Sequence, residues 1–301
     1  MPFRPVPAAR PPLARAQLEP REIKVCGFKA VAATFAVRPK CILRLFYTPE
    51  VFGRVGVGEY CRVLAQDRKP YRQVFADELE RIAGTVHHGG IVAVTERPAL
   101  QPPRFGDLAE WQRAGDPILF LDRIGNPHNL GAIARTAAFF GIKRMLIQRH
   151  AQQALPNDAA YRVAEGGLEH VQVYLVNDVL SLAKQLAPHF LVVGTSSHSG
   201  KPVEAARPPR APGRPVALFL GNEETGLDLK LAGQCELLVR VAGCGAMESL
   251  NVSTAAAILL HWITQGRPRA AFSAPTPPAP PTLPAPSAPP ARAGKFPLPK
   301  K

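Results

Sequence analysis

Residues 118–147 read ILFLDRIGNPHNLGAIARTAAFFGIKRMLI. An apolar run is followed by a polar stretch, an Ala-rich segment and a second apolar run. Apolar runs without polar alternation are typical of parallel strands that helices cover on both faces. The stretch therefore predicts two strands, at 118–121 and 144–147, joined by a helix at 130–140.

The same alternation continues to residue 265. Further strands are predicted at 171–175, 190–195, 216–220 and 237–241, and further helices at 158–164, 179–186 and 250–264. Such alternation predicts an α/β domain, with a parallel sheet between two helical layers. Residues 22–97 alternate less clearly and predict a small α/β domain that precedes it.

Proline marks the boundaries of these segments. Residues 268–299 hold 12 of the 33 prolines, and residues 98–115 hold three more in polar surroundings. We therefore expect a flexible segment at 1–21, a linker at 98–115 and a disordered, basic Pro/Ala-rich tail at 266–301. Because no run of about 18 apolar residues occurs, we expect no membrane span.

The charge distribution favours a polyanionic partner. The chain carries 37 Lys and Arg against 23 Asp and Glu, a formal net charge of +14. Residues 21–265 hold 28 basic and 22 acidic residues, so +6 of that charge lies outside the tails. This favours nucleic acid as a partner, although a charge that serves solubility explains the composition equally well. Five cysteines without C-x-x-C spacing favour a reducing, cytoplasmic setting, and eight scattered histidines predict no metal site.

Polar side chains follow three of the predicted strands, at the edge where parallel sheets bind ligands. At the first, Asn129 stands where we expect a helix to be capped, and Arg135 lies within that helix among Ile and Ala residues. Because a helix that is apolar all round is buried, we expect Arg135 to be buried beside an anion. That anion is either an internal carboxylate or a substrate phosphate.

The other two polar strand ends are residues 221–226 (GNEETG) and 249–253 (SLNVS). Gly221 lets a ligand approach the main chain, Glu223 offers acceptor oxygens, and Ser249 and Asn251 stand at the start of a helix. Each feature alone also fits ordinary helix capping. Three such ends in one domain predict a shared pocket, and incomplete dinucleotide and P-loop patterns argue against hydride or phosphoryl transfer.

The stretches at 126–135, 221–226 and 249–253, in this order, resemble the SpoU (TrmH) class of the SPOUT RNA methyltransferases. The match is most similar to a bacterial branch of tRNA/rRNA methyltransferases. It implies an α/β methyltransferase domain at 116–265 with a C-terminal trefoil knot at about residues 191–250. Residues 22–97, which include HGGIVA at 88–93, resemble an L30e-like RNA substrate-binding domain.

The resemblance also implies a homodimer and S-adenosylmethionine as the cofactor. The residues expected around that cofactor, largely through main-chain groups, are Thr195, Gly221, Val241 and Leu250. The implied reaction is methyl transfer to a ribose 2′-hydroxyl of tRNA or rRNA.

The family assigns substrate activation to Arg135. Since its pKa exceeds about 12, we expect Arg135 to bind the adjacent phosphate, which then accepts or relays the proton. Asn129 is expected to hold Arg135 or the ribose, whereas Glu223, Ser249 and Asn251 are expected to order the pocket and the substrate.

The sequence departs from the family pattern at two places. Asn126 stands where Asp is frequent, and Ala-Glu-Gly-Gly at 164–167 replaces the commoner Ser-x-Gly-Ala. Two alternatives stay open: an RNA-binding protein of this fold without activity, and a methyltransferase that acts on the base. The loop 196–215 either contacts RNA phosphates or is only solvated; its basic residues are Lys201, Arg207, Arg210 and Arg214.

Overall fold

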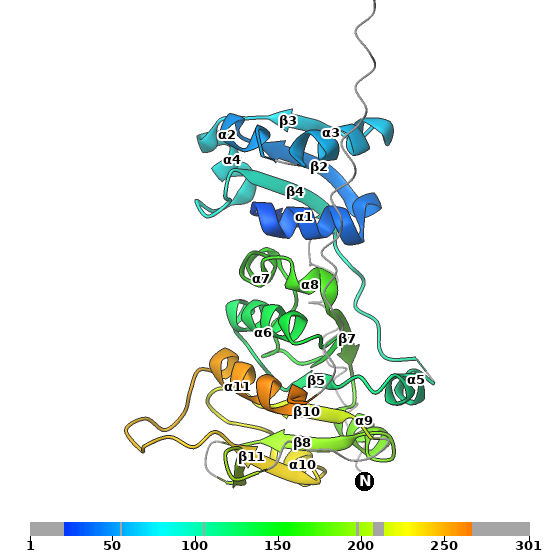
Figure 1. Ribbon diagram of the computed structural model, residues 1–301, viewed down its shortest axis with the longest axis vertical. Helices are drawn as coiled ribbons and strands as arrows, with labels where there is room; N and C mark the ends of the chain where they lie inside the picture. The colour runs from blue at the N-terminus through cyan, green and yellow to red at the C-terminus, as the bar shows by residue number, and fades with distance from the viewer. Residues whose placement is uncertain (1–20, 55, 105, 197–198, 207–213, 267–301) are drawn as a thin grey trace, which may run out of the picture. The chain divides into compact units, whose positions relative to one another are not determined.

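The computed structural model describes residues 21–54, 56–104, 106–196, 199–206 and 214–266. Two sheets form within these residues (Figure 1). The predictions for the two tails fall almost entirely outside the described residues, as do Arg207 and Arg210. No helix in the described ranges is long and apolar enough to cross a membrane.

The first sheet is mixed and has four strands in the order β1-β4-β2-β3. Its strands are β1 (Glu22–Cys26), β2 (Ile42–Tyr47), β3 (Tyr71–Gln73) and β4 (Ile91–Glu96). Strand β4 pairs antiparallel with both β1 and β2, whereas β3 pairs parallel with β2. The apolar runs at 42–47 and 90–95 predict strands close to β2 and β4, but no sequence pattern predicts the two edge strands.

Helices cover both faces of this sheet. They are α1 (Phe28–Val37), the 3₁₀ turn η1 (Pro39–Cys41), α2 (Pro49–Phe52), α3 (Val57–Gln66) and α4 (Ala76–Ala83). Helices α1 and α3 share one core with the sheet, where the rings of Phe35 and Tyr60 stack 4.1 Å apart. Helix α4 packs through Leu79 in a separate cluster that includes Val92 of β4. This sheet with helices on both faces confirms the α/β class that the sequence predicts for residues 22–97.

The second sheet has seven strands in the order β7-β6-β5-β10-β8-β11-β9. All of its pairings are parallel. Its strands are β5 (Ile118–Leu121), β6 (Arg144–Gln148), β7 (Gln172–Val176), β8 (Leu191–Thr195), β9 (Lys201–Pro202), β10 (Val216–Leu220) and β11 (Leu237–Arg240). Helix α5 (Asp107–Arg113) lies in the segment before β5. The helices that follow are α6 (Pro127–Phe139), α7 (Asp158–Ala164), α8 (Gly167–His170), α9 (Val179–Leu186), α10 (Leu229–Ala232) and α11 (Val252–Thr264).

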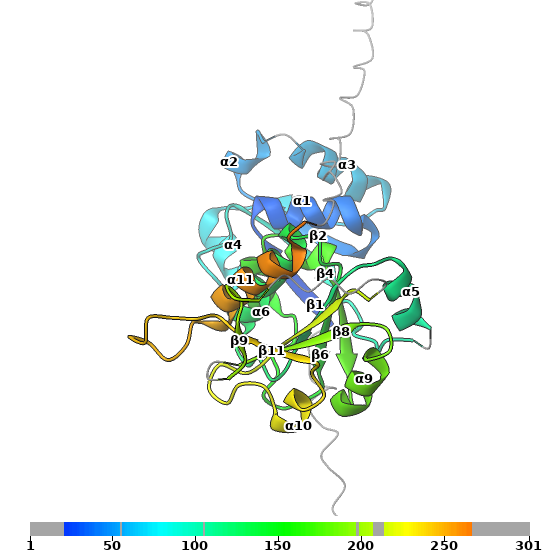
Figure 2. The same ribbon diagram turned by 60° about the horizontal axis from the view of Figure 1, so that its bottom comes forward.

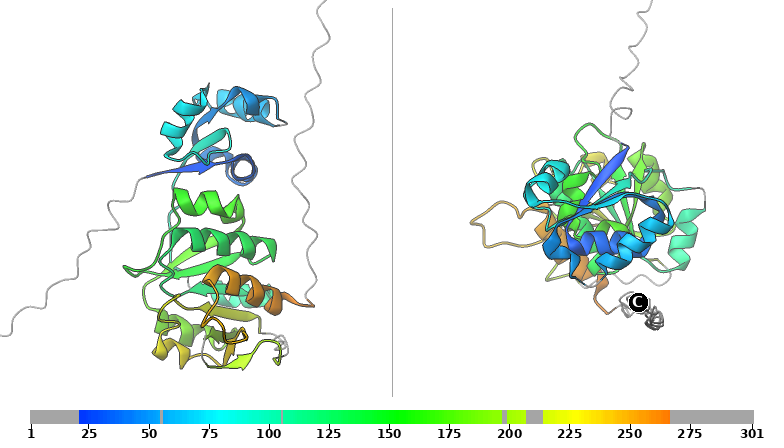
Figure 3. Two further views of the ribbon diagram at one scale, coloured as in Figure 1. Left: turned by 90° about the vertical axis from the view of Figure 1, so that its left-hand side faces the viewer. Right: turned by 90° about the horizontal axis from the view of Figure 1, so that it is seen from above.

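Alternate residues of the central strands face two different helical layers. Leu119 of β5 and Leu218 of β10 share a core with residues of α6 and α11, which lie side by side in Figures 1 and 3. Phe120 and Phe219, whose rings are 4.8 Å apart, share the opposite core with residues of α9 and α10. Figure 2 shows α9 and α10 on the side of the strands away from α11. The predicted parallel sheet between helices is therefore confirmed.

Two predicted helix starts are wrong. Helix α6 begins three residues earlier than predicted, because Asn126, not Asn129, accepts a hydrogen bond from the His128 amide and Pro127 occupies the first turn. Proline suits that position because its fixed φ is helical and its missing N–H would have no partner there. Helix α11 begins at Val252, with Asn251 rather than Ser249 as its cap.

The segment between the two predicted domains packs against β7. Helix α5 buries Trp111, whose ring lies 5.0 Å from that of Tyr174, and Gln101 forms a bridge with the same tyrosine. The sequence pattern at 108–113, within the expected linker, predicts a short helix here, close to the observed α5. Its packing on β7 was not predicted.

Hydrogen bonds join residues of β1 and of the end of α1, at the first sheet, to helices that pack on the second sheet. Glu169 of α8, almost fully buried, accepts from Arg38 Nε at 2.5 Å, from Arg38 Nη2 at 2.8 Å and from Thr34 Oγ1 at 2.8 Å. The main-chain amide of Lys24 donates to Asp158 at 3.1 Å. Burial opposes the charged form of Arg38, yet the hydrogen bond and charge of Glu169 outweigh it, so the pKa of Arg38 is raised.

Candidate active site

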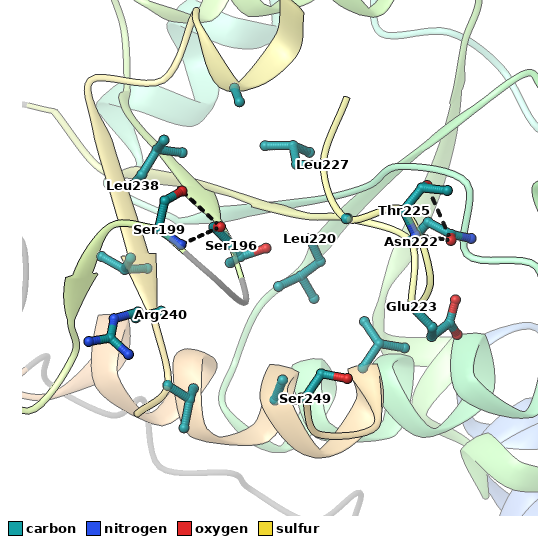
Figure 4. A pocket seen from close by; sticks show the side chains of 18 of the residues that line it. Ser196, Ser199, Leu220, Asn222, Glu223, Thr225, Leu227, Leu238, Arg240 and Ser249 are labelled. Atoms are coloured by element: carbon teal, nitrogen blue, oxygen red, sulfur yellow. Dashed lines mark hydrogen bonds between the residues drawn. The ribbon is translucent and has the colours of Figure 1, made fainter. Parts of the chain in front are cut away.

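A pocket of about 380 Å³ opens where the loops after β8, β10 and β11 meet (Figure 4). Parallel strands end at one edge of a sheet, so these loops converge although they are far apart in the sequence. Six of the nine predicted site residues line this pocket: Thr195, Gly221, Glu223, Val241, Ser249 and Leu250. In Figure 4, Ser249 lies on the loop before α11, and Glu223 lies on the loop after β10.

The loop after β10 folds back tightly on itself. Asn222 and Gly226 pair with each other through both of their main-chain hydrogen bonds, at 3.1 and 3.0 Å. A Cβ on Gly221 would lie 2.2 Å from the Leu227 amide nitrogen, and Gly226 has φ +68°. The loop's own main chain therefore requires a glycine at 221, and the expected approach of a ligand to this main chain stays a prediction.

Two residues after β5 brace this loop. Asp122, buried, accepts hydrogen bonds from the Arg123 guanidinium at 3.1 and 2.8 Å and from the Asp228 amide at 3.1 Å. Arg123 Nη2 donates to the Gly226 carbonyl at 3.2 Å, and its own carbonyl accepts from Asn222 Nδ2 at 2.8 Å. The hydrogen bond to Asp122 raises the pKa of Arg123, so this brace stays charged. Sequence reasoning missed Asp122, Arg123 and Asn222, although Asp-Arg directly after a buried strand was visible.

A chain of hydrogen bonds joins the three polar strand ends. Asn129 Nδ2 of α6 donates to Glu223 Oε1 at 2.6 Å, and Asn251 Nδ2 donates to Asn129 Oδ1 at 3.2 Å. Asn251 Oδ1 accepts from the amide and the hydroxyl of Ser253, at 2.8 and 2.6 Å. Asn251 thus caps α11 and fixes Asn129, which leaves Glu223 oriented at the rim of the pocket.

The strand β8 contributes a second polar wall. Thr195 Oγ1 donates to the Phe219 carbonyl at 3.0 Å, so its hydroxyl is fixed to β10. Ser196 Oγ contacts Ser199 Oγ at 2.9 Å and accepts from the Ser199 amide at 3.0 Å. These serines and Arg240 also line the pocket (Figure 4). Sequence reasoning missed all three; in the loop 196–215, which holds the two serines, it singled out only the basic residues.

Arg135 is exposed, although the sequence predicts that it is buried. Its side chain is 53% exposed, it does not line the pocket, and its guanidinium lies 3.2 Å from Glu165. The apolar residues Ile133, Ala134 and Ala137 face the core, whereas Arg135 and Phe139, one turn apart, share the exposed face. The expectation of a buried Arg135 is therefore wrong, and the anion beside it is a carboxylate.

Of the basic loop residues that the structure describes, Arg214 is engaged within the fold. It donates to the Phe190 carbonyl at 2.7 Å and pairs with Glu236. These contacts give Arg214 a role within the fold, whereas Lys201 is exposed, and a phosphate contact from this loop stays a prediction.

The pocket lining suits a ligand that is partly apolar and carries a positive charge. Leu220, Leu227 and Leu238 supply apolar walls, and Glu223, Glu224 and Glu248 supply carboxylates. Main-chain groups of the tight loop after β10 lie between them. A volume of about 380 Å³ falls within the range of small-ligand sites. These apolar walls and carboxylates therefore fit a compound that joins an adenosyl group to a cationic sulfonium centre.

Comparisons with known proteins agree with this geometry. Residues 116–261 match the model of the SpoU rRNA Methylase family, and residues 24–101 match the model for RNA 2′-O ribose methyltransferase substrate binding. The chain is 34% identical over 252 residues to an uncharacterized tRNA/rRNA methyltransferase, YfiF, of Escherichia coli O157:H7. That match covers 82% of this chain and 69% of that protein.

Two further relatives extend the picture. The 23S rRNA (guanosine-2′-O-)-methyltransferase RlmB of Acinetobacter baylyi is 35% identical over 191 residues, which cover 62% of this chain and 74% of that protein. The solved structure of an AdoMet-bound rRNA methyltransferase from Sinorhizobium meliloti matches with a TM-score of 0.64 and 22% identity, over 81% of this chain and 87% of that one. This structural likeness shows a shared fold.

Proposed function

The chain belongs to the SpoU rRNA methylase family, and we infer that it transfers a methyl group from S-adenosylmethionine to a ribose 2′-hydroxyl of tRNA or rRNA. The observation that carries this inference is the convergence of the three polar strand ends. Glu223, Asn129 and Asn251 form one hydrogen-bonded chain beside a pocket of fitting size and lining.

We propose that the pocket holds the cofactor through the loops after β8, β10 and β11. Main-chain groups near Gly221 and Val241, with Thr195 and Leu250 on either side, are the supporting contacts. The carboxylate of Glu223 favours a cationic ligand. When bound, S-adenosylmethionine supplies an electrophilic methyl group on a sulfonium centre.

On the substrate side, we propose that the polar chain positions the ribose. Asn129 is held by Glu223 and Asn251, so its amide is preorganised, and Ser249 lines the pocket together with Glu223. Preorganised donors and acceptors bring a hydroxyl into line with its electrophile and avoid reordering during the reaction. Arg135 is too strongly basic to remove the hydroxyl proton and serves instead to bind the neighbouring phosphate.

We also propose a homodimer, because Arg135 lies outside its own pocket and shares its face with apolar side chains. Phe139 of α6 is 79% exposed, Met247 of the loop before α11 is 79% exposed, and Ile258 of α11 is 37% exposed. Exposed apolar residues on neighbouring helices are typical of surfaces that bind a second copy. In such a dimer, Arg135 serves the pocket of the second copy.

We further propose the division of labour between the two sheets. Residues 22–97 bind substrate RNA, residues 98–115 link the domains, and residues 116–265 carry the chemistry, in keeping with the two family models. The trefoil knot at about residues 191–250 stays a prediction.

The test measures methyl transfer from labelled S-adenosylmethionine to tRNA and rRNA from a strain that lacks the gene. We expect label on ribose after nuclease digestion; label on a base would refute the 2′-O assignment, and no label would refute the activity. Arg135→Ala should abolish transfer while S-adenosylmethionine binding persists. Arg113→Ala, which removes an exposed arginine of α5, is the matched control.

A further inference from the structure

Three charged side chains from separate elements meet at one carboxylate oxygen. Glu165 Oε2 accepts a hydrogen bond from Lys29 Nζ of α1 at 3.3 Å, and it lies 3.2 Å from Arg135 Nη2 of α6. Glu165 stands in the turn between α7 and α8, within the stretch that departs from the family pattern. One anionic oxygen thus bridges a lysine beside the first sheet and an arginine beside the second.

The main chain of the turn that carries this carboxylate is held in place. Glu165 has φ +45°, a left-handed conformation that non-glycine residues rarely adopt. The two glycines after it have no room for a side chain: a Cβ on Gly166 would lie 2.7 Å from Ala33 Cβ, and one on Gly167 would lie 2.7 Å from Arg135 Cα. The main chain of the turn is therefore fixed between α1 and α6, whereas the Glu165 side chain keeps its rotatable bonds.

The three side chains are nevertheless open to solvent. Their exposed fractions are 75% for Lys29, 53% for Arg135 and 41% for Glu165. Exposed ion pairs contribute little to stability because water and salt screen them. An incoming anion that offers both cations better geometry can therefore replace the carboxylate at low cost.

We propose that Glu165 occupies the place of an RNA phosphate, and that Lys29 and Arg135 form a two-cation site which the substrate backbone enters by displacing Glu165. A phosphate oxygen bridges two cations as the Glu165 oxygen does, and its group carries further acceptors for the arginine fork. The inference rests on the proposed function and deepens it. In this proposal Glu165 competes with the substrate phosphate for Arg135, the residue that we expect to bind that phosphate.

The test is RNA affinity of the full chain, measured by fluorescence anisotropy with a labelled RNA hairpin at several salt concentrations. Glu165→Gln removes the competing charge and keeps the shape, so we expect Kd to fall about two- to fivefold at low salt. Lys29→Ala should weaken binding and lower the salt slope by about 0.7 to 0.9. The gain from Glu165→Gln should vanish when Lys29 and Arg135 are both alanine.

The matched control is Glu110→Gln, which removes one exposed carboxylate of α5, outside the residues proposed to bind RNA. It changes the net charge by the same amount, so a tightening equal to that of Glu165→Gln would overturn the proposal. A gain that persists without Lys29 and Arg135 would also overturn it. The proposal would also be overturned if Glu165→Gln left the RNA affinity unchanged and lowered the melting temperature, because Glu165 would then only stabilise the fold. Wild-type methyl transfer is measured in parallel; if it is present, a negative result refutes the competitor role alone.

Discussion

The tight loop after β10 makes a sharp prediction for Gly221→Ala. The added Cβ would lie 2.2 Å from the Leu227 nitrogen and 2.3 Å from the Gly226 carbonyl carbon, and both are main-chain atoms. Because real Cβ contacts exceed 3.0 Å, the loop must move by roughly 1 Å. Overpacking of this kind costs about 1–3 kcal/mol, which lowers the melting temperature by about 2 to 12 °C.

The same movement displaces the proposed cofactor contacts. We expect the Kd for S-adenosylmethionine, measured by calorimetry, to rise at least about tenfold, equal to a loss of about 1.4 kcal/mol. The control is Gly53→Ala, because Gly53 has φ −71° and no atom within 4 Å of an added Cβ. If Gly221→Ala and Gly53→Ala have the same Kd for S-adenosylmethionine and the same melting temperature, the tight loop after β10 does not form part of the cofactor site.

Three other predictions follow from buried groups. Glu169→Ala should lower the free energy of unfolding by about 3–5 kcal/mol in urea denaturation, because it strands the guanidinium of Arg38; a loss near zero would contradict the buried contact. Burial raises the pKa of Tyr161 to about 12, above its ordinary 10.0, so its contribution to stability is complete below pH 10 and is lost as pH rises through about 12. Tyr161→Phe should flatten that alkaline loss in pH-dependent denaturation, and an unchanged slope would assign the loss to other groups. Burial also raises the pKa of the Cys235 thiol to about 12, whereas Cys244 is exposed, so iodoacetamide at pH 8 should alkylate Cys244 first by mass spectrometry; the reverse order would show that the β11 region opens.

Burial decided which elements the sequence could predict. The strand β10 has bounds equal to the prediction because all five of its residues are buried and apolar. The strand β3 escaped because its three residues are exposed and carry no apolar pattern, and β9 has only two residues. Such strands exist because a neighbouring strand offers free main-chain groups, which is a tertiary cause without a local signal.

The wrong predictions of a cap at Asn129 and of a buried Arg135 have two other causes. Asn126 and Asn129 are both good helix caps, and only Pro127, which favours the first helical turn, distinguishes them. Around Arg135, alanines were interpreted as a fully apolar helix, but alanine is small enough to lie on a half-exposed face. A count of large apolar side chains would have predicted the exposed stripe that Arg135 and Phe139 form.

The meeting of Asn129 with Glu223 depends on strand order rather than on any local pattern. The strand β10 lies between β5 and β8, in register with Ile118–Leu121 on one side. The loops after β5 and β10 therefore emerge side by side, although 94 residues separate the two site residues. Local periodicity predicts a parallel sheet but leaves its strand order open. Only the combined motifs indicated that these loops lie together, and the Asn129–Glu223 hydrogen bond is the contact that results from the strand order.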